Sequence, residues 1–225
     1  MKIAIVGGGF YGCYLAKNLS KNNEIHLFEK NSKLITESGK NNQYRLHLGF
    51  HYPRSTKTIQ QTKEGYTRFK KEFKNFIYFP KNNYYLIHKK SLVSFDKYCK
   101  IFQKKKIVFK KVNLKNIPYL KSIHDYSGAI QTNEGVIMID KLIKSLRKEV
   151  KSNARVKVNT KIDKIDSANG KLYFKNNNFK NFDYIINTTY LNPNLGLTKK
   201  KFLKKYEATA MLLPNIKIPN IPAIT

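Results

Sequence analysis

The sequence has little cysteine, few acidic residues and no long apolar stretch. Its two cysteines, Cys13 and Cys99, form neither a CxxC pair nor a ligand cluster, which argues against a disulfide framework and a metal site. No apolar run approaches the roughly 18 residues of a membrane span, and the first expected strand starts at Lys2, which leaves no room for a signal peptide. We therefore expect a cytoplasmic protein without a bound metal, whose redox chemistry, if it has any, comes from a cofactor.

The shortage of acid leaves a large positive charge. Only 14 residues are Asp or Glu against 44 Lys and Arg, which gives a formal net charge of +30. Such a charge favours polyanions by counterion release, so a basic nucleic-acid-binding protein is one hypothesis. The basic residues are nevertheless spread along the chain, in runs such as 104–106, 110–111 and 199–201. Abundant Lys, Asn, Ile, Phe and Tyr all have A/T-rich codons, so we favour biased composition and solvated faces over nucleic acid as a partner.

Glycine is concentrated at the start of the chain, between an apolar run and a helical pattern. Residues 2–6 read as a buried strand, residues 10–21 as a helix and residues 25–29 as a second strand. Two strands joined by one helix in about thirty residues form a βαβ unit with parallel strands. The chain, 225 residues long and 41% hydrophobic, is long enough for one large domain or two modest ones.

The glycine spacing predicts a dinucleotide-binding turn. Gly7, Gly9 and Gly12 form GxGxxG, in which the first permits a tight turn, the second lets the backbone approach a pyrophosphate, and the third allows close packing of helix on strand. The phosphate would lie at the N-terminus of the following helix. Glu29 ends the second strand, where a carboxylate accepts the ribose hydroxyls and disfavours the 2′-phosphate of NADP.

Further along, helical and extended patterns alternate, and the polar segment 38–55, rich in His and Arg, reads as a long functional loop. Helices are predicted over 57–74, 91–103 with Ser91 as a possible N-cap, and 140–150. Strands are predicted over 76–88, 107–112, 129–132, 155–159, 162–167, 172–174 and 183–187.

The order of the motifs resembles the FAD-dependent oxidoreductases of the D-amino-acid oxidase and glycine oxidase type. The resemblance rests on VGGGFYG, HLFEK, SGKNNQYRLHLGFHYPRS, IQTNEGVIMIDKLIKSL and FDYIINTTY, and it spans residues 1 to about 195. It implies FAD as the cofactor and an α/β fold, a doubly wound, Rossmann-like FAD-binding domain with a mostly parallel sheet from residues 1–75 and 132–195. Residues 76–131 and 196–225 would belong to an α+β substrate-binding domain.

The resemblance also implies a reaction, in which a hydride passes to the flavin from a small-molecule substrate, from a carbon bearing an amine or a hydroxyl. Members of the family are substantially longer, and only 36 residues follow Thr189 in this chain. We therefore expect a truncated substrate-binding domain. A truncated, non-catalytic dinucleotide-binding fragment is the alternative function.

Carried over position by position, the resemblance assigns site residues but no catalytic residue. The glycines would hold the pyrophosphate, Glu29 the adenosine ribose, and the loop that follows would run under the pyrophosphate towards the flavin. The predicted cofactor-binding residues are Gly7, Gly9, Phe10, Tyr11, Gly12, Glu29, Lys30, Ser38, Asn42, Gln43, Arg45, His47, Gly49, Thr188 and Thr189. His51 and Tyr85 are predicted to face the substrate or the flavin.

The chemistry of the loop residues agrees with these assignments but leaves alternatives open. His47 and His51 are spaced like a helical metal pair, but Gly49 and Pro53 disfavour a helix there and no carboxylate completes HExxH. For both histidines, ordinary loop hydrogen bonding competes with a flavin-facing role. Packing of Tyr85 against a sheet competes with a place in a substrate pocket.

Overall fold

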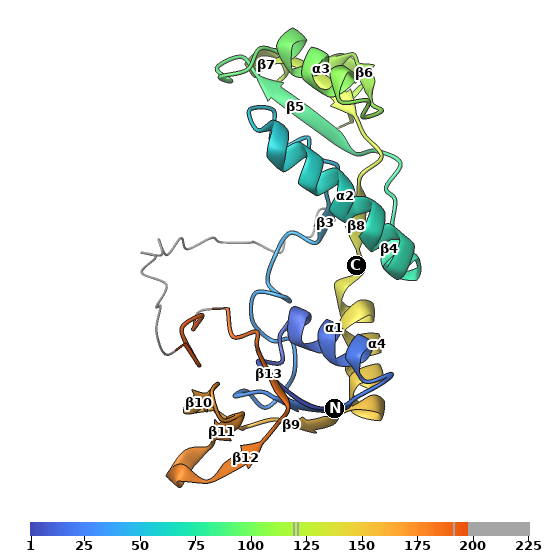
Figure 1. Ribbon diagram of the computed structural model, residues 1–225. Coiled ribbons are helices and arrows are strands. Elements are labelled where there is room, and N and C mark those ends of the chain that lie inside the picture. The colour runs from blue at the N-terminus through green and yellow to red at the C-terminus, as the bar shows by residue number, and fades with distance from the viewer. Residues whose placement is uncertain (119, 121, 191, 198–225) are drawn as a thin grey trace. The chain divides into compact units, whose positions relative to one another are not determined.

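The computed structural model describes residues 1–118, 120, 122–190 and 192–197 (Figure 1). These residues form two compact units. Unit 1 comprises residues 1–43 and the described residues from 139 onward, and unit 2 comprises Tyr44–Met138. None of the described helices has the length and apolarity needed to cross a membrane. Residues 196–225 are predicted to contribute to a substrate-binding domain, and all of them except 196 and 197 lie outside the described residues.

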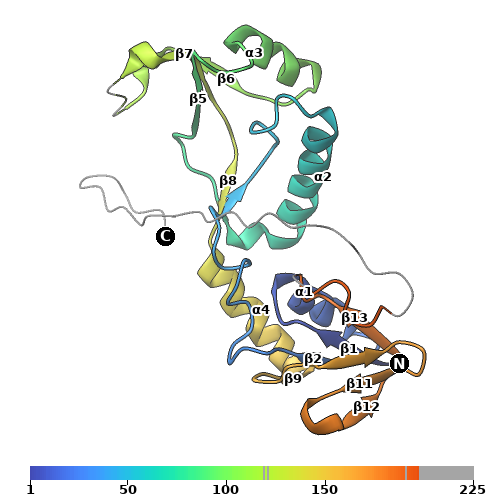
Figure 2. The same cartoon turned by 90° about the vertical axis from the view of Figure 1, so that its left-hand side faces the viewer.

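A four-stranded parallel sheet forms the centre of unit 1. Its strands are β1 (Lys2–Val6), β2 (Glu24–Phe28), β9 (Arg155–Lys157) and β13 (Tyr184–Asn187), in the order β13-β1-β2-β9. Helix α1 (Phe10–Leu19) connects β1 to β2, helix α4 (Ile139–Asn153) precedes β9, and both lie on one side of the sheet (Figure 2). The predicted α/β architecture with a mostly parallel sheet is confirmed.

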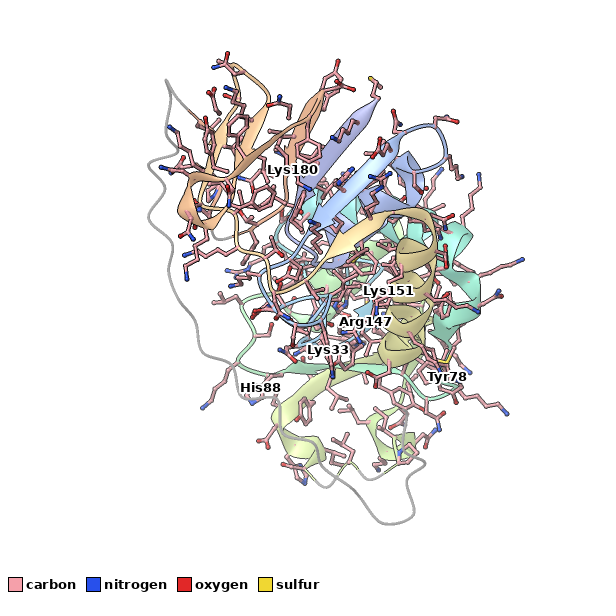
Figure 3. All side chains as sticks on the ribbon, turned by 90° about the horizontal axis from the view of Figure 1, so that it is seen from below. Lys33, Tyr78, His88, Arg147, Lys151 and Lys180 are labelled. Carbon is pink, nitrogen blue, oxygen red and sulfur yellow. The ribbon has the colours of Figure 1, made fainter. Side chains whose placement is uncertain are left out.

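Charged side chains project from the surface of both helices and strands of unit 1. Figure 3 shows Arg147 and Lys151 on α4 and Lys180 on β12 (Phe179–Asn181). Arg147 and Lys151 thus share one helix, whereas Lys180 lies on a strand of the antiparallel sheet.

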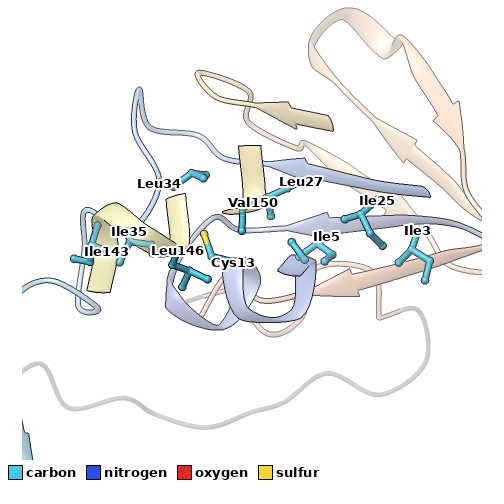
Figure 4. Close-up of a cluster of buried hydrophobic side chains, with 11 residues drawn as sticks. Ile3, Ile5, Cys13, Ile25, Leu27, Leu34, Ile35, Ile143, Leu146 and Val150 are labelled. Carbon is cyan, nitrogen blue, oxygen red and sulfur yellow. The ribbon is translucent and has the colours of Figure 1, made fainter. Parts of the chain in front are cut away.

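Both faces of the central sheet are buried, because successive side chains of a strand point to opposite sides. On the helix side, Ile3 and Ile5 pack with Ile25 and Leu27 against Cys13 and the apolar stripe of α4 (Figure 4). On the other side, the core is formed by Ala4, Val6, Phe28, Ile162, Ile165, Leu172 and Phe182. This second layer includes the antiparallel sheet β10 (Lys164–Asp166), β11 (Lys171–Tyr173) and β12.

The described residues of unit 2 form two three-stranded antiparallel sheets and two α-helices. Its helices are α2 (Thr56–Phe73) and α3 (Phe95–Lys104). One sheet has the order β3 (Arg45–Leu46), β8 (Gly135–Ile137), β4 (Ile77–Tyr78), and the other β5 (Tyr84–His88), β7 (Tyr126–Gln131), β6 (Lys110–Val112). The core is formed by Phe50, Ile59, Tyr85, Ile87, Val93, Tyr98, Cys99, Phe102, Ile107 and Ile130. Short 3-10 helices span Lys74–Phe76, Leu114–Asn116 and Ile123–Asp125 here and Lys175–Asn177 in unit 1.

The predicted start of the third helix was wrong. Helix α3 begins at Phe95 with Ser94 at its N-cap, not at Ser91. Val93 turns into the core, and its N–H donates to Ser91 Oγ at 3.4 Å, so the segment before α3 is occupied by a turn. Strands β8 and β12 were not predicted, and each is defined by its pairing with neighbouring strands.

The two compact units divide the chain at different points from the predicted domains. The sequence suggested limits near residues 75 and 132, whereas the units meet at 43/44 and 138/139. The difference arises because Ile59 of α2 is buried in the core of unit 2, and because β3 pairs with β8 there. The long loop predicted over 38–55 is correspondingly interrupted by β3.

Candidate functional site

The glycine motif forms a tight turn between β1 and α1. Gly7 has φ +106°, and its N–H donates to the carbonyl of Phe28 at 2.8 Å. A Cβ at Gly12 would lie 1.9 Å from the carbonyl oxygen of Gly7, whereas a Cβ at Gly9 would meet no atom of the described residues within 4 Å. Gly12 therefore permits the packing of helix on strand, and Gly9 leaves open space beside the start of α1. A pyrophosphate placed there would meet the positive end of the helix dipole.

Glu29 lies directly against this turn. Its side chain is buried, and Oε2 accepts from the N–H of Gly8 at 2.6 Å while Oε1 accepts from the N–H of Asn31 at 2.8 Å. An ionised carboxylate has about four acceptor positions, so two hydrogen bonds leave capacity for further donors. The structure thus brings the predicted ribose-binding acid to the glycine turn.

Thr188 connects the end of β13 to the same turn. Its hydroxyl lies 2.9 Å from the carbonyl oxygen of Val6 and 2.8 Å from that of Gly7, and its N–H also donates to Val6. Thr189 instead hydrogen-bonds through its N–H and hydroxyl to Asn187 Oδ1. Both threonines therefore stabilise the strand end beside the glycines.

The segment after β2 folds back onto the glycine turn. The N–H of Ile35 donates to the carbonyl of Gly8 at 2.8 Å, and a Cβ at Gly39 would lie 3.3 Å from Cβ of Phe10. From α4, Arg147 Nε donates to the carbonyl of Leu34 at 2.9 Å. The remaining predicted residues of this region are exposed: Tyr11, Lys30, Ser38, Asn42 and Gln43.

A second group of predicted residues gathers in unit 2 around an acid that the sequence analysis missed. Glu134 is fully buried and accepts hydrogen bonds from the hydroxyl of Tyr85 at 2.6 Å, from the N–H of Leu48 at 2.5 Å and from Arg45 at 3.3 Å. His47 Nδ1 lies 3.7 Å from Glu134 Oε2. We call these residues, with His51, the Glu134 cluster.

The electrostatics of the Glu134 cluster follow from burial and from its donors. Burial opposes ionisation of Glu134, but interactions with His47, Tyr85 and the N–H of Leu48 outweigh it and hold the pKa below its ordinary value. Burial, with the neighbouring His47 and Arg45, lowers the pKa of His51. Burial and the charge of Glu134 raise the pKa of Tyr85. At neutral pH the cluster therefore holds a carboxylate, a neutral His51 imidazole and a protonated Tyr85.

Gly49, one of the predicted cofactor-binding residues, lies in a turn that packs against α2. Gly49 has φ +107°, and a Cβ there would lie 3.2 Å from Cα of Ile59 on α2. A positive φ and this close approach both favour glycine, so Gly49 permits a turn that packs against a helix. His47 and His51 lie in this turn region and not on a helix. The described residues contain no group of three or more His, Cys, Asp or Glu able to hold a metal ion.

The predicted site residues therefore fall into two groups, one in each unit. The glycines, Glu29, the segment 38–43 and the two threonines belong to unit 1, whereas Arg45, His47, Gly49, His51 and Tyr85 belong to unit 2. Glu134 stands in the quoted stretch IQTNEGVIM as the only acid between Asp125 and Asp140. That isolation was the available signal, but only the fold shows that the side chain is buried.

Each unit also contains a groove. In unit 1, a groove of about 560 Å³ is lined by Lys40 and by the basic face of α4, and none of the predicted cofactor-binding residues contributes to it. In unit 2, a groove of about 480 Å³ is lined by His51, Tyr85, Phe50, Tyr98 and parts of 86–91. The second groove therefore borders the Glu134 cluster.

Comparison with known proteins identifies relatives over most of the chain. The profile of a family described as FAD dependent oxidoreductase (DAO) matches residues 2–212. The FAD-dependent monooxygenase FPY4 of Fusarium mangiferae is 28% identical over 228 aligned residues, covering 99% of this chain and 57% of that protein.

Solved structures share the fold. Glycine oxidase from Geobacillus kaustophilus has a TM-score of 0.65 at 14% identity, with 84% of this chain and 55% of that chain covered. Dithionite-reduced L-α-glycerophosphate oxidase from Mycoplasma pneumoniae with FAD bound has a TM-score of 0.61 at 20% identity, with 82% and 52% covered. The chain thus spans little more than half the length of these relatives.

Proposed function

Since the chain belongs to the DAO family of FAD-dependent oxidoreductases, we propose that unit 1 binds FAD and that the whole protein oxidises a small-molecule substrate. The observation that carries this proposal is the glycine turn, where open space at Gly9 lies beside the start of α1 and the Glu29 carboxylate bonds to Gly8. These features suit a dinucleotide, because a pyrophosphate needs backbone N–H donors and a ribose needs an acceptor.

Each part of the turn has a proposed role. The N-terminus of α1 and the backbone of residues 7–12 would hold the pyrophosphate, with Phe10 and Tyr11 in the first turn of the helix. Glu29 would accept the adenosine ribose hydroxyls, with Lys30 beside it. Ser38, Asn42 and Gln43 would lie along the dinucleotide, and Thr188 and Thr189 would keep the strand end close to it.

When bound, FAD would accept a hydride from a carbon of the substrate that bears an amine or a hydroxyl. Arg45, His47, His51 and Tyr85 are proposed to lie on the flavin or substrate side, in line with their common cluster around Glu134. This cluster would contribute a fixed guanidinium and a neutral imidazole, which bind and orient a polar substrate.

FAD binding by the purified chain tests the proposal. We expect flavin absorbance in the purified or FAD-reconstituted protein, and at least a roughly tenfold weaker affinity in Gly9→Ala and Glu29→Ala. Glu64→Ala removes an acid from the exposed face of α2 and serves as the charge-matched control, which should bind FAD like the wild type. Absence of flavin binding by the folded wild-type chain would contradict the proposal.

A second candidate function is dinucleotide binding without turnover. It requires only the glycine turn and Glu29, both of which lie in unit 1. Anaerobic mixing of the FAD-loaded chain with amino acids and hydroxy acids separates the two. Bleaching of the flavin absorbance supports the oxidoreductase, and stable absorbance with all of them supports binding alone.

A further inference from the structure

The connection between β7 and β8 places a carboxylate in the interior of unit 2. Glu134 has no exposed surface, although the desolvation of a charged group is costly unless the charge is compensated. The compensation comes from two segments of the chain: Arg45, His47 and the N–H of Leu48 lie on the first, and Tyr85 lies on the second. A single buried charge thus connects residues that the sequence separates widely.

Arg45 is fixed from several directions by this arrangement. Its guanidinium donates to Glu134 at 3.3 Å and to Asn83 Oδ1 at 3.1 Å, and it lies 4.9 Å from the centre of the Tyr85 ring. Asn83 in turn donates through Nδ2 to the backbone carbonyl of Glu134 at 3.1 Å. Arg45 and Tyr85 therefore depend on the same carboxylate for their orientation.

Contacts between aromatic rings connect the Glu134 cluster to the groove in unit 2. The His51 ring packs edge-to-face against the rings of His47 and Tyr85. The distances between ring centres are 4.7 Å to His47 and 5.0 Å to Tyr85. His51 and Tyr85 both line the groove of about 480 Å³. Glu134 lies behind this wall, since it contacts His47 and Tyr85 and is itself inaccessible.

We propose that Glu134 is a positioning residue, which acts through Tyr85 and His47 to fix the imidazole of His51 at the wall of the groove. The inference rests on the proposed function, in which this wall faces the substrate or the flavin. Glu134 does not reach the groove, so its contribution is the orientation and charge of other side chains.

Several charged groups act on His51, and each has a defined sign. His47 and Arg45 disfavour the imidazolium, and Glu134 favours it. His88 and Lys90 also line the groove, together with Tyr85 and Tyr98. Removing only the charge of Glu134 should therefore lower the pKa of His51 further, a change that loss of packing alone does not predict.

The test uses Glu134→Gln, which keeps the shape of the side chain and removes its charge. The titration of His51 is followed by NMR in the whole chain without flavin, with Glu64→Gln on α2 as the matched control. We expect the His51 midpoint to move to lower pH in Glu134→Gln and to stay at the wild-type value in Glu64→Gln. A wild-type midpoint in folded Glu134→Gln overturns the proposal.

A second variant covers the case in which Glu134→Gln does not fold. Tyr85→Phe keeps the ring but removes the hydrogen bond of 2.6 Å to Glu134. We expect weaker ring-to-ring NOEs between residue 85 and His51, and unchanged NOEs overturn the proposal. Both measurements are made without FAD, so failure of the chain to bind FAD would count against the proposed function and not against the role of Glu134.

Discussion

Gly12 and Gly9 show that one residue type serves two purposes within a single turn. At Gly12 a side chain has no room, because its Cβ would lie 1.9 Å from the Gly7 carbonyl oxygen. At Gly9 the same addition would lie more than 4 Å from every atom in the part of the chain that the structure describes. Gly12 is required by the packing of helix on strand, whereas Gly9 leaves open a volume that the proposed cofactor would fill.

This difference predicts that alanine substitutions at the two positions affect different properties. Gly12→Ala should lower the free energy of unfolding by about 1–3 kcal/mol or more, because the added methyl group forces helix and strand apart. Gly9→Ala should change it by less than about 0.5 kcal/mol and act on FAD affinity instead. Urea denaturation without FAD measures both, and equal destabilisation of the two variants would contradict the structure.

Helices α2 and α3 both begin after a serine, but the two serines act differently. Ser55 Oγ accepts from the N–H of Thr58 at 3.3 Å and lies 2.7 Å from the Thr58 hydroxyl. Ser94 occupies the N-cap position of α3 without a side-chain hydrogen bond to the helix. The N-terminus of α2 is therefore stabilised by a side-chain hydrogen bond, whereas Ser94 provides none to the N-terminus of α3.

Replacing each N-cap serine with alanine should destabilise the protein to different extents. Ser55→Ala should cost about 1 kcal/mol, because an N–H of the first turn of α2 loses its acceptor. Ser94→Ala is the matched control and should cost less than half as much. Thermal unfolding followed by circular dichroism measures the difference, and a larger loss in Ser94→Ala would show that the cap assignment is wrong.

Across the whole molecule, buried groups that ionise at high pH occur in both units. Burial raises the pKa of the Cys13 thiol in unit 1 from 9.0 to about 12. In unit 2, burial is the main cause that raises the pKa of Tyr85 and Tyr98, and the charge of Glu134 adds to it. Each of these groups holds its proton more tightly in the folded chain than in the unfolded chain.

The free energy of unfolding should therefore decrease at alkaline pH. Below pH 9.0, the unfolded pKa of a thiol, the contribution of Cys13 is fully present, and it is lost as pH rises towards about 12, because only the unfolded chain releases the proton. The two tyrosines act in the same direction above pH 10.0, their unfolded value. Urea denaturation across this range should show a decline that is smaller in Cys13→Ala. Constant stability over the range would rule out the linkage.

Local sequence determined the first βαβ unit and its glycine turn. Residues 2–29 carry the apolar runs, the glycine spacing and Glu29 in one continuous stretch, and the hydrogen bonds that complete the turn are formed largely among them. The alternation of strands and helices could likewise be read from periodicity, because period and composition are properties of neighbouring residues.

Tertiary structure alone decided the second half of the site. Glu134 contacts Tyr85 and Arg45 across 49 and 89 positions of sequence, and Thr188 reaches Gly7 across 181. It also placed α2 with unit 2 and assigned Gly49 to helix packing. The sequence shows which residues are acidic, aromatic or small. It does not show which carboxylate is buried, because the residues that exclude water from it come from distant segments. Burial, and with it the need for hydrogen-bond donors around the carboxylate, is therefore a property of the folded chain.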